Sequence, residues 1–261
     1  MKIAIQLYTL RDNMSQSVEE TLAAVSKMGY DGVEFAGLYG KTGEEMLALC
    51  KKYSLEPISA HISVADSEKP EVLSEYVKIG IKYAVIPGTA KPDEENYREK
   101  IRMVGGICDV FAKCGFIPGY HNHSYELERE FEGERYLDLL FSANPDIKTE
   151  LDFCWLKFGG GEPLDYINQY AGRVDIIHMK DFVSEKYGKT SRGIGARVPL
   201  DEGLDFDQRP VGDGVIDAEA IVSAAKKVGT EWLVVELDTP QKGMTALECA
   251  ARSVENLKKL I

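Results

Sequence analysis

The stretch KVGTEWLVVE, residues 227–236, joins a helix end, a glycine and a run of apolar residues that closes on a carboxylate. The same junction recurs as KMGYDGVEF at 27–35 and as KCGFIPGYH at 113–121. Between such junctions, apolar residues recur every three or four positions, the pattern of repeated βα units on a parallel sheet. Eight candidate strands can be counted, beginning at Ile3, Gly32, Pro57, Tyr83, Phe116, Lys148, Val174 and Trp232.

The chain length suits one such repeat array. At 261 residues the protein fits the α/β barrels that reach about 250 residues as one domain. We therefore predict an α/β fold, a single (β/α)8 TIM barrel over residues 1–261. A long irregular loop is expected at about 182–217, after the seventh strand. It is interpreted either as a lid that brings a cation over the barrel mouth or as an oligomer contact or mobile insertion. Its cations are Lys186, Lys189, Arg192 and Arg197.

Composition excludes several classes of partner. The formal net charge of −12 opposes binding to a phosphate backbone, so nucleic acid is not expected. No apolar run reaches the roughly 18 residues that a membrane helix needs. Met1 leads straight into a strand pattern without a secretory signal, and the five cysteines form no CxxC pair, so we expect a cytoplasmic protein with reduced thiols. A homo-oligomer is left open.

The whole chain holds four histidines, and each falls at the predicted carboxyl end of a strand. One histidine at a strand end is more often structural than catalytic. Four at one face favour a functional site, because barrel enzymes assemble their sites from several strand ends. These residues are His61, His121, His123 and His178.

Carboxylates share this placement: Glu34, Asp152 and Glu236 end strands, and Glu126 follows shortly after the fifth. Burying so many carboxylates together is unfavourable unless a cation neutralises them. An oxygen-rich site with imidazole indicates one divalent ion: Mn²⁺, Mg²⁺, Co²⁺ or Zn²⁺. The alternative for Glu236 is a salt bridge at the barrel mouth to Lys180.

The motifs GVEF, SAHIS, GYHNHSYE, ELDFCW, IIHMKD, VGDG and VVELD, in this order, resemble the xylose-isomerase-like superfamily of sugar phosphate isomerases and epimerases. That resemblance implies one metal ion held by a Glu, an Asp, a His and a second Glu. By position, Asp152, His178 and Glu236 match the last three. Many relatives carry the first glutamate where this chain has His121-Asn122-His123. Either Glu126 or one of these histidines then completes the set, and we assign Glu126.

The resemblance also implies a reaction, proton abstraction next to the carbonyl of a ketose or keto-sugar, with Glu126 and Glu236 as the acid/base pair. The alternatives are a metal-dependent lyase or dehydratase acting on an inosose or a 3-keto-glycoside, and a non-catalytic sugar-binding barrel. The substrate is expected to be a small sugar or sugar derivative. Residues expected to hold it, with Trp155 as an aromatic wall, are Glu34, His61, His121, His123, Lys180 and Trp155.

Overall fold

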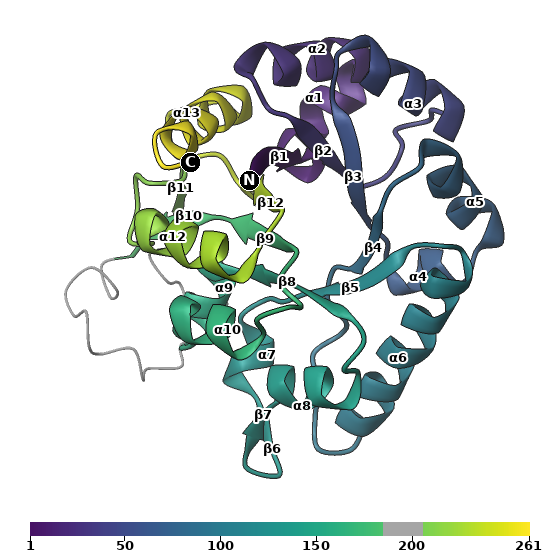
Figure 1. The fold of residues 1–261 in the computed structure, drawn as a ribbon, viewed down its shortest axis with the longest axis vertical. Coiled ribbons are helices and arrows are strands. Elements are labelled where there is room, and N and C mark those ends of the chain that lie inside the picture. Colours follow the sequence, from purple (N-terminus) through teal and green to yellow (C-terminus); the bar gives the residue numbers. More distant parts are fainter. Residues whose placement is uncertain (185–205) are drawn as a thin grey trace.

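The computed structural model describes residues 1–184 and 206–261. Eight parallel strands close into a barrel in the order β1-β12-β9-β8-β5-β4-β3-β2 (Figure 1). The predicted TIM barrel is confirmed. Its strands are β1 (Lys2–Gln6), β2 (Gly32–Phe35), β3 (Glu56–His61), β4 (Tyr83–Ile86), β5 (Ile117–His121), β8 (Lys148–Asp152), β9 (Ile176–Met179) and β12 (Trp232–Val235).

Helices surround the barrel, and local sequence signals set their ends. Thr42 and Thr245 each begin a helix with a capping box, in which the side chains of Glu45 and Glu248 return to the cap backbone. Gly29 ends a helix in the left-handed conformation (φ 88°) that glycine adopts without strain. The helices are α1 (Arg11–Gln16), α2 (Val18–Met28), α3 (Gly43–Lys52), α4 (Val64–Ser67), α5 (Pro70–Ile79), α6 (Tyr97–Lys113), α7 (Tyr125–Glu128), α8 (Tyr136–Ala143), α9 (Phe153–Phe158), α10 (Pro163–Gln169), α12 (Ala218–Val228) and α13 (Ala246–Lys258), with a 3-10 turn, η1 (Leu7–Leu10).

Apolar side chains fill the lower half of the barrel, toward the amino ends of the strands. This cluster is separate from the larger core between the strands and the helices. Because successive side chains of a strand alternate in direction, the residues two positions further along point into the same interior, nearer the mouth. The apolar plug consists of Ala4, Ile58, Tyr83, Val85, Ile176, Trp232 and Val234.

The predicted strand starts agree with the structure at Gly32, Tyr83, Lys148 and Trp232. The other four predicted strand starts differ from the observed ones by one or two residues. The first hydrogen bond to a neighbouring strand, and not the first apolar residue, defines where a strand starts.

The loop predicted at about 182–217 is regular at both edges, where β10 (Asp181–Val183) pairs antiparallel with β11 (Asp207–Arg209). A second small hairpin, β6 (Glu130–Phe131) with β7 (Glu134–Arg135), precedes α8. The cations proposed for a lid, at 186–197, lie outside the described residues. Within the described part of the chain, no helix combines the length and apolar character needed to cross a bilayer.

Candidate metal centre

Polar side chains line the barrel interior above the apolar plug, at the carboxyl ends of the strands. His178 lies on β9, two positions beyond Ile176 of the plug, and Glu236 follows β12, two positions beyond Val234. On β8, the same alternation turns both Glu150 and Asp152 inward. All four of these side chains are buried.

His178 has a carboxylate at each ring nitrogen. Its Nδ1 lies 2.8 Å from Glu236 Oε2, and its Nε2 lies 2.7 Å from Glu34 Oε1. Burial alone would lower the pKa of His178, but the negative charges of Glu150 and Glu34 outweigh it and raise that pKa well above the ordinary value. When Nε2–H donates to Glu34, the lone pair of Nδ1 is free to bind a metal ion. Metal-bound histidines typically donate their other N–H to a carboxylate in this way.

Glu34 lies beneath the mouth and is fully buried. Besides His178, it accepts hydrogen bonds from Gln6 Nε2 at 2.7 Å and from Ser59 Oγ at 2.5 Å. Burial would raise its pKa, but the charges of His61 and His178 prevail and lower the pKa of Glu34 to about 2. Sequence analysis assigned Glu34 to substrate binding; the structure places it below the cavity, where it orients His178.

Lys180 is buried among three carboxylates. Its Nζ lies 3.1 Å from Asp152 Oδ2, 2.9 Å from Glu236 Oε2 and 3.1 Å from Asp238 Oδ2. Burial lowers the pKa of Lys180, yet the three negative charges raise it well above the ordinary value. One ammonium alone does not balance three carboxylates, and His178 supplies a second positive charge beside Glu236. The salt bridge between Lys180 and Glu236, considered from sequence as the alternative, is present.

Local contacts hold Asp152 in place. As the N-cap of α9, its Oδ1 accepts from Trp155 N at 2.9 Å, which leaves Oδ2 toward the barrel axis. Asn122 bridges β5 to β8: its Oδ1 accepts from Asp152 N at 3.0 Å, and its Nδ2 donates to Asp152 O at 3.3 Å. Burial raises the pKa of Asp152 to about 6, against the charges of Lys180 and His178.

The donor set fits a divalent ion. One ligand atom from each of His121, Asp152, His178 and Glu236 lies within 4.8 Å of every other. Among the residues that the structure describes, Asp152 Oδ2 has no hydrogen-bond partner, although it lies close to the lysine ammonium. Two carboxylates with two imidazoles suit Zn²⁺, Mn²⁺ or Co²⁺. We call these four residues the mouth cluster.

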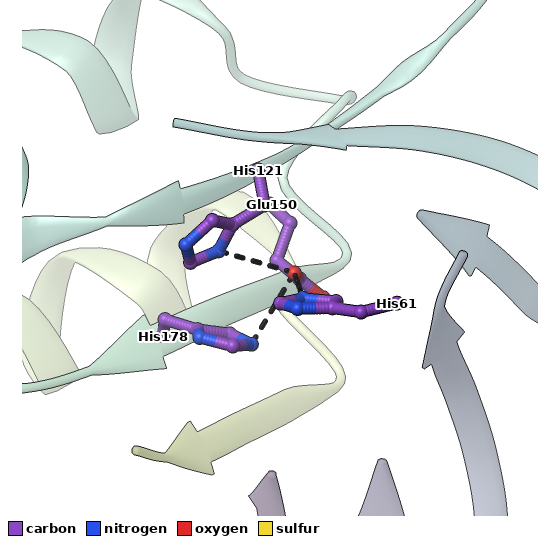
Figure 2. Close-up of side chains that lie close together, drawn as sticks. All are labelled: His61, His121, Glu150 and His178. Carbon is purple, nitrogen blue, oxygen red and sulfur yellow. Dashed lines mark hydrogen bonds and ion pairs between the residues drawn. The ribbon is translucent and has the colours of Figure 1, made fainter. Parts of the chain in front are cut away.

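A second group of possible ligands lies beside the mouth cluster. Figure 2 shows the rings of His61, His121 and His178 gathered around the carboxylate of Glu150. Glu150 Oε2 is 2.6 Å from His61 Nε2, 3.3 Å from His121 Nδ1 and 3.2 Å from His178 Nε2. We call these four residues the inner cluster.

Glu126, predicted as the fourth metal ligand and a catalytic group, belongs to neither cluster. It is fully buried on α7, where it accepts from Tyr120 Oη and from His123 N, each at 2.8 Å. Burial raises the pKa of Glu126 to about 7, although these hydrogen bonds oppose the shift. Of the two choices that the sequence left for the fourth ligand, the structure brings a histidine, His121, to the other three.

A cavity of about 440 Å³ opens above the mouth cluster, a size typical of small-molecule sites. A larger surface hollow beside α8 and α10, of about 680 Å³, shares no lining residue with it. Trp155, predicted as an aromatic wall, instead stacks on Phe206 at 5.3 Å and does not line the cavity. The cavity is lined by Tyr8, Ala36, Gly37, His61, Ser63, Asp66, Tyr76, Pro87, His121, His123, Lys180, Glu236 and Asp238.

His123, expected to bind substrate, lines this cavity, and its buried Nδ1 has no hydrogen-bond partner within residues 1–184 and 206–261. Burial, helped by the charge of Lys180, lowers the pKa of His123 to about 4, so its ring is neutral.

Sequence reasoning missed Glu150, Asn122 and Asp238. For Glu150 a signal was present, since it lies two positions before Asp152 on the same strand face. Asp238 likewise follows Glu236 by two positions. Asn122 carried no signal of its own, because its role depends on β8, a strand that lies far along the chain.

An eight-stranded barrel with histidines, carboxylates and a buried lysine at its mouth defines the class of barrel proteins that carry their chemistry at the carboxyl ends of the strands. Within that class, the chain belongs to the xylose isomerase-like TIM barrel family, which residues 22–260 match. The resemblance read from the motifs is confirmed.

Individual relatives are distant. The chain is 23% identical over 267 residues to an inosose dehydratase of Geobacillus kaustophilus (strain HTA426), covering 88% of this chain and 82% of that one. A solved sugar phosphate isomerase/epimerase from Parabacteroides distasonis ATCC 8503 superimposes with a TM-score of 0.78, at 19% identity over 98% of this chain and 93% of that one. The IolI protein, solved with a bound zinc atom, superimposes with a TM-score of 0.70, at 17% identity over 100% of this chain and 98% of that one.

Proposed function

We propose that this protein is a divalent-metal-dependent sugar isomerase or epimerase that removes a proton next to the carbonyl of a ketose or keto-sugar. The observation that carries the proposal is the position of Glu236. Its carboxylate lines the cavity, contacts the ammonium of Lys180 and belongs to the mouth cluster. A base, a cation and a set of metal ligands thus meet at one wall.

His121, Asp152, His178 and Glu236 would hold the ion. When bound, it would supply Lewis-acid stabilisation of the substrate oxygen on which negative charge develops. This assignment replaces Glu126 by His121, because Glu126 is engaged by Tyr120 and His123 away from the cluster.

Glu236 is the proposed base. Its contacts with His178 Nδ1 and with Lys180 Nζ use Oε2. The other carboxylate oxygen, Oε1, takes part in neither of these contacts and can accept the substrate proton. Lys180 donates to the developing oxyanion from a buried position, where a fixed charge acts strongly.

His61 is the proposed second acid/base group. It lines the same cavity from β3, and its Nε2 is held by Glu150 at 2.6 Å. Because Nε2 is engaged by Glu150, the other ring nitrogen, Nδ1, would carry the proton that returns to the substrate on a different side from Glu236, as epimerisation requires.

A lyase is the second candidate, favoured by the inosose dehydratase among the relatives. Its first step is the same, and His61 would then protonate the leaving group instead of carbon. A purely sugar-binding barrel is the third and explains the site least well, since binding alone does not require a base and an acid beside a metal centre.

Solvent isotope exchange tests the proposal. Ketoses, an inosose and 3-keto-glycosides are incubated with Mn²⁺-, Co²⁺- or Zn²⁺-loaded protein in D2O. We expect deuterium at the carbon next to the carbonyl, with inversion there for an epimerase or loss of the β-substituent for a lyase. Turnover without solvent label would show a hydride shift and refute the proposed mechanism.

Two matched variants assign the base. Glu236→Gln should abolish deuterium incorporation while leaving the fold intact, because the amide cannot accept the proton. Glu56→Gln makes the same change at the exposed amino end of β3 and should exchange like the unmodified protein. Near-normal exchange by Glu236→Gln would assign proton removal to another residue.

A further inference from the structure

We propose that the inner cluster is a second, alternative position for a divalent cation of zinc type, beside the mouth cluster. Three imidazoles and one carboxylate form a donor set that Zn²⁺ commonly takes. All four residues are buried except His61, whose side chain is 10% exposed at the cavity floor. The cavity therefore provides the entry path for an ion.

The distances suit a small tetrahedral ion. Bonds of 2.0–2.2 Å to nitrogen and oxygen place neighbouring ligand atoms about 3.3 Å apart. Glu150 Oε2 lies 3.3 Å from His121 Nδ1 and 3.2 Å from His178 Nε2. His61 Nε2 lies only 2.6 Å from Glu150 Oε2, so the His61 ring must move slightly toward the cavity when an ion binds.

One ligand atom of this cluster, His121 Nδ1, is buried and finds no hydrogen-bond partner among the residues that the structure describes. Leaving such an atom unpaired costs free energy that coordination recovers. The charges in this region also favour a divalent ion. The carboxylates of Glu34 and Glu150 both face the cluster, and a divalent ion bound by neutral imidazoles balances their two negative charges.

His178 decides between the two positions. With its proton on Nε2, held by Glu34, Nδ1 serves the mouth cluster. With its proton on Nδ1, held by Glu236 Oε2 at 2.8 Å, Nε2 faces the inner cluster. Each tautomer keeps a carboxylate on the non-ligating nitrogen, as metal-bound histidines require. The two positions share His121 and His178, so one ion occupies either of them.

The choice of metal follows from the ligands. With two carboxylates the mouth cluster suits Mn²⁺ or Co²⁺ as well as Zn²⁺, whereas the nitrogen-rich inner cluster favours Zn²⁺. If the proposed function holds, zinc in the inner position occupies His61 and so lowers activity. The inner position itself does not depend on the reaction.

Metal binding by variants tests this inference without activity. In Asp152→Asn/Glu236→Gln the mouth cluster loses both carboxylates, while the amide oxygen introduced at position 236 can still accept from His178 Nδ1. We expect this variant to retain about one Zn²⁺ or Co²⁺ per chain after dialysis, as one four-ligand set implies. Its Co²⁺ form should show the strong visible absorption of tetrahedral sites, and X-ray absorption should count three imidazoles. Adding Glu150→Gln should remove both the ion and the absorption.

The inference is overturned if the folded double variant holds no ion, or if its ion survives Glu150→Gln. Should the double variant fail to fold, anomalous scattering from zinc-soaked Asp152→Asn crystals decides: an ion beside Glu150 supports the inner position, and an ion beside Glu236 refutes it. Failure of the proposed function would appear separately, as missing deuterium exchange by the Mn²⁺-loaded unmodified protein.

Discussion

At the scale of single residues, the site depends on carboxylates that hold other side chains. Glu34 holds His178 from below, and Glu150 holds His61. Glu126 holds the backbone of His123 and the hydroxyl of Tyr120. Glu126 was predicted from sequence as a metal ligand, yet it can act through the segment that it positions, as Glu34 can act through His178. Mutation of such supporting groups typically weakens metal binding about 10- to 100-fold.

Glu126→Gln should become more stable, relative to the unmodified protein, as the pH rises. The folded pKa of Glu126 is raised to about 7 from 4.5, chiefly by burial. Between these values the unfolded chain loses a proton that the native state keeps. The unmodified protein therefore loses up to about 3 kcal/mol of stability from pH 4.5 to above pH 7. The amide does not titrate and can still pair with Tyr120 and His123.

Urea unfolding of both proteins at several pH values between 5 and 8 measures this difference. A stability difference that does not change with pH would mean that Glu126 is ionised throughout and has a different role.

At the scale of elements, Asp181 ties the VGDG turn to the end of β9. Its carboxylate accepts from four backbone N–H groups, those of Phe182 at 2.8 Å and of Gly212, Gly214 and Ile216 at 3.0 Å each. A Cβ on Gly214 would lie 2.2 Å from Asp181 Oδ1, so only glycine permits this approach. The turn thereby fixes the strand end that carries Lys180.

Asp181→Asn should lose about 2 kcal/mol of stability, because the amide presents N–H groups to backbone donors that then lack an acceptor. Backbone amides of 212–216 should also exchange hydrogen faster. Unfolding and hydrogen-exchange measurements test both effects, with the exposed Asp165→Asn on α10 as control. Unchanged exchange at 212–216 would show that the turn is held by other contacts.

At the scale of the whole molecule, the mouth cluster links β5, β8, β9 and the end of β12 across the barrel. An ion bound there stabilises the native state, because the unfolded chain does not bring the four ligands together. The barrel and its metal affinity are therefore coupled.

Mn²⁺ at 100 times its dissociation constant should add about 2.7 kcal/mol, which raises the Tm of a chain of this size by about 5–10 °C. Scanning calorimetry with and without chelator measures the shift. The Asp152→Asn variant should lose most of this Mn²⁺-dependent rise in Tm, and the Glu56→Gln variant should retain it. A Tm that does not respond to any divalent ion would contradict the proposed metal centre.

By itself, the sequence determined the eight βα units and the strand ends at which histidines and carboxylates occur, because side-chain alternation and helix periodicity are local properties. Only the tertiary structure decided which of these groups meet. Glu150 reaches His61, 89 positions earlier in the chain, whereas Glu126 is only five positions from His121 and is turned away by Tyr120 and His123. Barrel closure, and not sequence spacing, sets the distances between strand ends.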